Sequence, residues 1–131
     1  EHGLDETMKV LVIEDEPLIR DIYAEFLELL GHEAEVTADG REGLARFGGP
    51  YLAGAGFTVV DAFFVPVAFR VRTYGLALGA PAAAYAQRLL ALPSSLAWEA
   101  DALRETWREF GHEQEILASG TLLEDHRATA P

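Results

Sequence analysis

The sequence predicts a mixed α/β fold in which helices dominate, with a βαβα front over residues 8–47 and an all-helical segment over residues 48–125. The run 9–13 is apolar and β-branched, which is typical of a strand buried in a parallel sheet. Apolar residues then recur at three- and four-residue spacing through most of the chain. The composition changes sharply at Gly48 and Gly49, so the two pieces are expected to meet there.

The front piece begins with this strand, which ends in three acidic residues, Glu14, Asp15 and Glu16. Pro17 suits the first turn of a helix. Gly31 ends that helix. The apolar stripe of this helix consists of Ile19, Ile22, Phe26, Leu29 and Leu30. A weakly alternating stretch over 32–38 predicts a second strand, and 41–47 predicts a short helix after Asp39 and Gly40.

Charge is distributed unevenly over the two pieces. The net charge is -12, with 13 acidic residues against 4 basic ones in residues 1–47 and 9 against 6 in residues 48–131. Such a surface repels phosphate backbones and anionic lipids, so neither nucleic acid nor a membrane surface is expected as a partner. Divalent cations suit this charge better. Clustered carboxylates at the carboxyl end of a parallel strand are ligands that Mg²⁺ prefers.

The run Val-Leu-Val-Ile-Glu-Asp-Glu-Pro at 10–17, with Gly-His-Glu at 31–33 and Asp-Gly-Arg-Glu-Gly-Leu at 39–44, resembles the opening third of a response-regulator receiver domain. The resemblance implies that Glu14 and Asp15 correspond to the acid pair that binds Mg²⁺ during two-component phosphorelay. It also implies a histidine kinase as the partner that donates the phosphoryl group to an aspartate after the third strand.

The rest of the receiver machinery is not matched. The only lysine, Lys9, begins the first strand and cannot also follow the fifth, where the family has its lysine. Asp61 ends an apolar run and is the candidate phosphoacceptor, but it lies about three residues later than the family pattern, and Pro66 follows one residue too late. This spacing disfavours the role. Glu14 and Asp15 are then a solvated acidic strand end without a working partner.

In the back piece, Thr58 and Asp61 fit a capping box, with Asp in place of the usual Glu or Gln. The following residues fit a helical stripe, although their Val, Phe and Thr content suits strands equally, and Pro66 would lie inside the helix. A helix from Pro81 through Leu92, closed by Pro93, is expected next. Further helices are expected from Leu96 to Phe110 and from Glu113 to Ser119.

Residues 48–64, with 65–70 and 72–75, resemble the later part of a bacterial glutathione S-transferase. The likeness extends to about residue 125 and implies that Thr58 and Asp61 cap that family's sixth helix. The family binds glutathione mostly on an N-terminal thioredoxin-like domain, and nothing before Gly48 resembles it. The helices that line much of the family's electrophile pocket are also unmatched. Glutathione conjugation is therefore not expected.

Several other sites are disfavoured. Cysteine is absent, and His2, His32, His112 and His126 form no metal-binding motif. Because Met8 is the only methionine and follows a polar stretch, residues 1–7 are expected to be a leftover extension. Residues 126–131 are expected to form a polar tail. No apolar run approaches the roughly 20 residues of a membrane helix, so a cytoplasmic location is expected.

The leading hypothesis is a hybrid or truncated protein without a complete active site and without enzymatic activity. No cofactor is certain, and Mg²⁺ is the one that the receiver resemblance implies. One alternative is a degraded receiver in which Glu14, Asp15 and Asp61 still gather Mg²⁺. Another is a transferase-related helical module that binds apolar ligands. A histidine kinase partner and self-association are left open, and no sequence pattern supports either.

Overall fold

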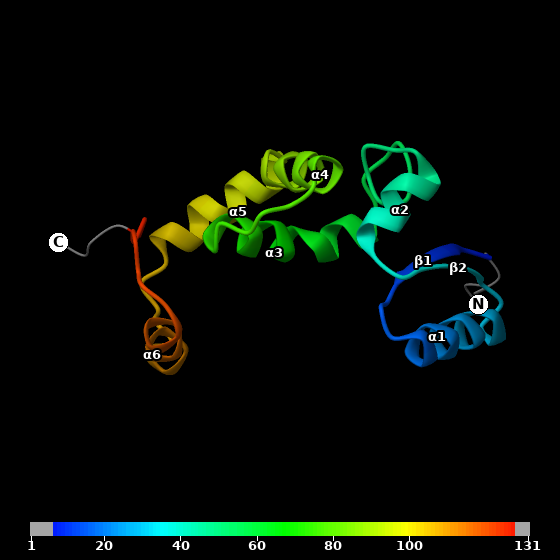
Figure 1. Ribbon diagram of the computed structural model, residues 1–131, viewed down its shortest axis with the longest axis horizontal. Coiled ribbons are helices and arrows are strands. Elements are labelled where there is room, and N and C mark those ends of the chain that lie inside the picture. The colour runs from blue at the N-terminus through cyan, green and yellow to red at the C-terminus, as the bar shows by residue number, and fades with distance from the viewer. Residues whose placement is uncertain (1–6, 128–131) are drawn as a thin grey trace, which may run out of the picture. The chain divides into compact units, whose positions relative to one another are not determined.

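The computed structural model describes residues 7–127, which form six helices and two parallel strands (Figure 1). The prediction of a mixed α/β fold dominated by helices is confirmed. The chain divides into two compact units, the first ending at Leu90 and the second beginning at Ala91. The expected extension, residues 1–7, and the expected tail, residues 126–131, lie mostly outside the described residues.

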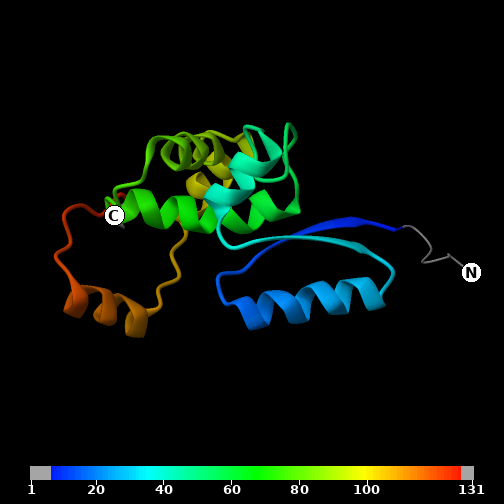
Figure 2. The same ribbon diagram turned by 45° about the vertical axis from the view of Figure 1, so that its right-hand side comes forward.

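Strands β1 (Lys9–Ile13) and β2 (Glu33–Thr37) pair in parallel along their whole length, with Lys9 opposite Glu33 and Ile13 opposite Thr37. Helix α1 (Pro17–Leu29) makes the crossover and packs on both strands (Figure 2). Parallel strands need such a connection because their ends lie far apart. A two-stranded sheet is marginal by itself, so the strands depend on α1 and on the following helix α2 (Gly40–Phe47), which contacts β2.

Thr37 ends β2 with a buried hydroxyl, because its side chain is only 1% exposed and its Oγ1 has no hydrogen-bond partner among residues 7–127. Burying an unpaired hydroxyl costs free energy that an apolar group of the same shape avoids. We expect Thr37→Val to raise the free energy of unfolding by about 1 kcal/mol in urea denaturation. Thr37→Ser, which keeps the hydroxyl and removes the methyl group, should lower it. A loss of stability in Thr37→Val would show that the hydroxyl has a partner.

Helix α2 begins and ends with clear signals. The Asp39 carboxylate accepts hydrogen bonds from the backbone N–H groups of Arg41 and Glu42, at 2.8 and 2.9 Å, which caps the helix. Gly48 ends it in the left-handed conformation with φ 61°. Gly43 is buried, and a Cβ atom there would lie 3.4 Å from the carbonyl oxygen of Leu52. The absence of a side chain at Gly43 therefore lets α2 approach the segment beyond Gly48 and Gly49.

The remainder of the first unit is α3 (Val59–Thr73) and α4 (Ala80–Leu90), which pack against each other. The segment that suited either helix or strand is therefore a helix, and Pro66 lies inside it. The expected helix after Pro81 starts one residue earlier and ends at Leu90. Of the described apolar residues, five are buried, and all of them belong to these helices or the loop before them. They are Leu52, Ala68, Tyr85, Ala86 and Leu89.

The second unit extends one prediction and corrects another. The helix after Pro81 does end before Pro93, and Pro93 itself opens α5 (Pro93–Arg104), where its missing N–H costs nothing. The single helix expected from Leu96 to Phe110 is wrong, because α5 ends at Arg104 and α6 (Phe110–Ser119) begins separately. Helical stability comes mainly from packing of the apolar face. Among residues 7–127, Trp107 and Phe110 pack on little and remain mostly exposed, so their apolar side chains do not stabilise a helix between them.

Ion pairs join the segments around α6. The Glu113 carboxylate accepts hydrogen bonds from the Arg108 guanidinium at 2.5 and 2.6 Å and from Arg127 at 2.9 Å. These two guanidinium groups lower the pKa of Glu113 to about 2. Arg104 pairs with Asp101 within α5, whereas Arg108, in the segment between α5 and α6, pairs with Glu113 of α6. None of the helices in residues 7–127 has the length and apolar character needed to cross a bilayer.

Candidate functional site

The most completely buried charged residue in the described chain is Asp61, whose side chain has no exposed surface. One carboxylate oxygen, Oδ1, accepts hydrogen bonds from the backbone N–H of Leu52 at 3.0 Å and from the Tyr85 hydroxyl at 2.9 Å. The other, Oδ2, accepts from the backbone N–H of Thr58 at 2.8 Å and from its hydroxyl at 3.1 Å. Four donors therefore surround the two oxygens, which is what a buried carboxylate requires.

The position of Asp61 follows from the start of α3. Thr58 is the N-cap residue, and Asp61 is the third residue of the helix, so the two form a capping box. The pKa of the Tyr85 hydroxyl lies well above its ordinary value, mainly because the group is buried and also because it is hydrogen-bonded to the Asp61 carboxylate. Tyr85 therefore stays protonated, and its hydroxyl donates a hydrogen bond to the carboxylate. Asp61 thus joins the loop, the helix start and α4 at one point.

An apolar cavity of about 350 Å³ lies within the first unit, between α2, α3 and α4. This volume is at the lower end of the range for small-molecule sites, which runs from about 300 to 1,000 Å³. Most of its lining is aliphatic or aromatic. The apolar lining residues are Leu44, Leu52, Phe64, Val67, Ala68, Val71, Ala77, Leu78, Ala82, Tyr85, Ala86 and Leu89.

The polar side of the cavity is formed by the start of α2, where Asp39, Gly40 and Arg41 line it. Asp39 and Arg41 form an ion pair with 3.1 Å between Oδ2 and Nη2, so their charges offset each other. The N–H of Glu42, and then the Arg41 guanidinium, hold the pKa of Asp39 below its usual value. Because Asp39 and Arg41 are paired, the cavity presents no uncompensated charge to a ligand. Gly40, between them, lies close to α3, since a Cβ atom there would lie 3.4 Å from the Phe64 ring.

Asp61 supports the cavity from behind. It does not line the space itself, but it holds Leu52 through its backbone and Tyr85 through its hydroxyl, and both of these residues line the wall. The Tyr85 ring also meets the Phe64 ring edge to face, with centroids 6.4 Å apart and an interplanar angle of 66°. The buried hydrogen bonds of Asp61 therefore hold two wall residues, Leu52 and Tyr85, in place, so this wall of the cavity is formed by the folded protein itself.

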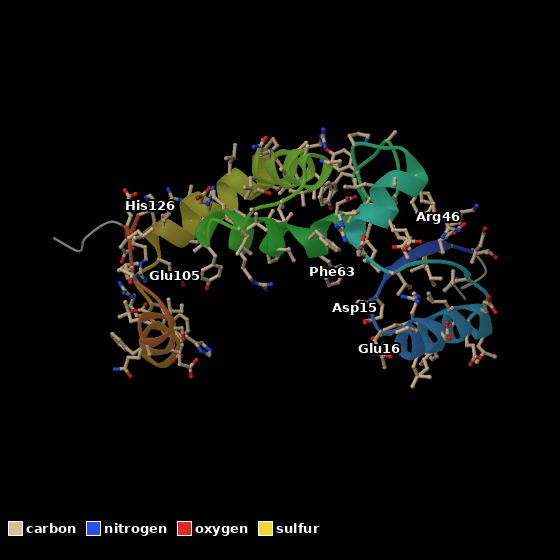
Figure 3. The ribbon with its side chains drawn as sticks, in the orientation of Figure 1. Asp15, Glu16, Arg46, Phe63, Glu105 and His126 are labelled. Carbon is tan, nitrogen blue, oxygen red and sulfur yellow. The ribbon has the colours of Figure 1, made fainter. Side chains whose placement is uncertain are left out.

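The expected metal ligands lie elsewhere in the first unit. Glu14 follows β1 and accepts a hydrogen bond on Oε1 from the N–H of Glu16 at 3.1 Å. Asp15 and Glu16 lie at the turn between β1 and α1 (Figure 3). No group of three or more metal-binding side chains occurs within residues 7–127, so Asp61 is not gathered with Glu14 and Asp15. The four donors around Asp61 come instead from Leu52, Thr58 and Tyr85.

Binding of apolar ligands was one alternative drawn from the sequence, but the place of the cavity was not predicted, although a sequence signal for it exists. Residues 77–86 are rich in alanine and glycine, and four of the lining positions, Ala77, Gly79, Ala82 and Ala86, carry no side chain beyond Cβ. Small residues facing large ones at a helix contact either draw the backbones together or leave space. Here they leave space, since α4 faces α2 and α3 across the cavity.

The protein is thus mostly helical α/β, and its first unit contains an apolar pocket. Comparison adds no relative: no protein family model, curated protein or solved structure matches the chain.

Proposed function

We propose that this protein is a non-catalytic binding module whose cavity takes up small, neutral, apolar molecules. The observation that carries the proposal is the cavity of about 350 Å³, with a mostly apolar lining and a charge-compensated edge at Asp39 and Arg41. Removing an apolar ligand from water stabilises the complex by about 25 cal/mol per Å² of buried apolar surface. The paired charges at the edge favour neither an anion nor a cation.

We also propose that residues 8–47 derive from a receiver-like segment and residues 48–125 from a glutathione-transferase-like helical segment. The βαβα order at the front and the Thr58–Asp61 capping box at the back support this proposal. A cytoplasmic location belongs to the same proposal and rests on the sequence. The hybrid then combines parts of two families without the full set of reacting residues of either.

Two features of the residues themselves oppose phosphoryl transfer. The single lysine, Lys9, begins β1 and forms an ion pair with Glu33, with 3.2 Å between Nζ and Oε1. Both oxygens of Asp61 already accept two hydrogen bonds each, and the side chain is fully buried. A nucleophilic carboxylate must reach its phosphoryl donor, so Asp61 would have to leave this network before it could react.

Binding can be tested with the neutral fluorescent probe N-phenyl-1-naphthylamine and two matched variants of α4. Ala82 lines the cavity, whereas Ala84 is exposed two residues further on and does not line it. We expect Ala82→Leu to fill part of the cavity and weaken probe binding about 10-fold, and Ala84→Leu to leave it unchanged. Fluorescence titration measures both affinities.

The same titration can overturn the proposal in two ways. Binding to the wild-type chain no stronger than to its urea-unfolded form would show that the cavity holds no ligand. Equal affinities of Ala82→Leu and Ala84→Leu would show that the probe binds at another apolar surface. Circular dichroism of both variants confirms that any difference comes from the cavity and not from loss of the helices.

A further inference from the structure

Helix α1 has two apolar sides, and the sheet covers only one of them. Ala24 and Leu27 are half-buried and lie on the side that packs on β1 and β2. Arg20 is on the same side, where its guanidinium donates to the carbonyl oxygen of Glu14 at 2.8 Å. Figure 2 shows α1 along the strands with its other side away from them. An amphipathic helix that covers a sheet needs only one apolar stripe, so the second requires another explanation.

The second apolar side is large and continuous. Its side chains are between 39% and 85% exposed. They are Leu18, Ile19, Ile22, Tyr23, Phe26, Leu29 and Leu30, here called the outer α1 face. Seven large apolar residues at these exposures form a patch at least comparable with the largest apolar patch of a typical monomer, about 300–600 Å². A standard stable interface buries about 800 Å² on each partner, so the outer α1 face would supply much of the area that one interface needs.

The acidic residues of α1 do not interrupt this face. At 100° per residue, Asp21, Glu25 and Glu28 cluster on a third side of the helix, which faces neither the sheet nor the outer α1 face. A partner could therefore cover the apolar residues without burying a carboxylate. This separation favours a partner with an apolar surface of the same kind, and it argues against a basic partner held by ion pairs.

We propose that the outer α1 face is the contact between two copies of this chain, with the two α1 helices antiparallel across a twofold axis. The main stripe, Ile19, Tyr23, Phe26 and Leu30, is spaced symmetrically about the midpoint between residues 24 and 25. An antiparallel pair therefore sets Ile19 against Leu30 of the partner subunit, and Tyr23 against Phe26 of the partner subunit. A self-complementary patch is what a twofold interface requires.

Charge opposes this pairing but does not prevent it. Each copy carries a net charge of -12, so two copies repel each other over a distance set by the ionic strength. Salt screens this repulsion and strengthens the burial of apolar surface. The dimer is therefore favoured by added salt, the reverse of an interface held by ion pairs.

Sedimentation equilibrium of the full chain tests the contact, using one variant on α1 and a matched one on α3. We expect a dimer at about 100 µM and a dissociation constant raised at least about 100-fold by Phe26→Glu. Phe63→Glu makes the same change on α3, where the side chain is 75% exposed, and should leave the dimer intact. A wild-type monomer at this concentration in high salt, or equal effects of the two variants, would overturn the proposal.

The orientation has a separate test, because the chain contains no cysteine and a single one can be placed at will. In the antiparallel pair, position 23 lies within about 5 Å of its symmetry mate along the helix axis, whereas position 19 lies about 16 Å from its own. A short thiol crosslinker should therefore join Tyr23→Cys dimers and leave Ile19→Cys uncrosslinked. Equal crosslinking at both positions would show a parallel pair and overturn the antiparallel arrangement.

Discussion

Replacing Asp61 by Asn is expected to lower the free energy of unfolding by about 3 kcal/mol. The carboxylate accepts four hydrogen bonds on its two oxygens, from Leu52, Thr58 and Tyr85. An amide keeps one acceptor oxygen but turns its NH2 group toward two of these donors, where no water can intervene because the side chain is fully buried. Urea denaturation followed by circular dichroism should show a lower midpoint with an unchanged slope.

Asp21→Asn is the matched control for this variant, since Asp21 lies on the exposed side of α1. It should change the stability by less than about 0.5 kcal/mol. A stability of Asp61→Asn equal to that of the wild type would mean that the network around Asp61 contributes nothing.

The wild-type chain and Asp61→Asn also test the alternative that the protein is a degraded receiver. After incubation with acetyl phosphate and Mg²⁺, we expect the intact mass of the wild-type chain to be unchanged. A phosphoryl adduct that Asp61→Asn abolishes would instead show that Asp61 is a phosphoacceptor.

Gly49→Ala is expected to destabilise the first unit by at least about 3 kcal/mol, which places it among the severe single substitutions. A Cβ atom at Gly49 would lie 1.8 Å from the carbonyl oxygen of Gly54 and 2.1 Å from its carbonyl carbon. These are backbone atoms, and Gly54 is held by two hydrogen bonds with Tyr51, at 3.1 and 3.2 Å. The turn between Tyr51 and Gly54 must open to make room. The 2.8 Å hydrogen bond that the Arg88 guanidinium donates to the carbonyl oxygen of Pro50 is then expected to break.

Gly56→Ala provides the comparison for this effect, because a Cβ atom there meets nothing within 4 Å and the backbone is not in the left-handed region. Such a change restricts the unfolded chain and should be neutral or stabilising by about 0.5 kcal/mol. Thermal and urea unfolding of the two variants measure the difference. If both alanine variants were equally stable, the close approach of Gly49 to Gly54 would not exist in solution.

Local patterns predicted the elements of the first unit well. The apolar run 9–13 and the turn signals after it placed β1 and α1, and the weaker alternation over 32–38 placed β2. The start of α3 could also be anticipated, since a capping box involves residues only three positions apart. In the second unit the same periodicity failed around Trp107, because a regular apolar stripe forms a helix only where something packs on it.

The candidate site depended on contacts that no local pattern carries. Tyr85 donates to Asp61 across 24 residues, and Leu52 donates to it across 9, so neither bond could be anticipated from spacing. The cavity needs the relative placement of three helices, which is decided by packing. Glu14 and Asp15 form a plain acidic pair in the sequence, yet the structure brings no third ligand to them among residues 7–127.

The walls of the cavity come from both sides of Gly48 and Gly49. Asp39, Gly40, Arg41 and Leu44 precede this point, and the remaining lining residues follow it. Neither stretch could therefore hold a ligand by itself, and a bound molecule would act as a bridge between them. Because a ligand that binds only the folded form stabilises it by about 2.7 kcal/mol at 100 times its dissociation constant, occupancy would tie the two stretches into one cooperative unit. Under the proposed hybrid origin, the proposed ligand binding would belong to the union of the two stretches and to neither ancestor.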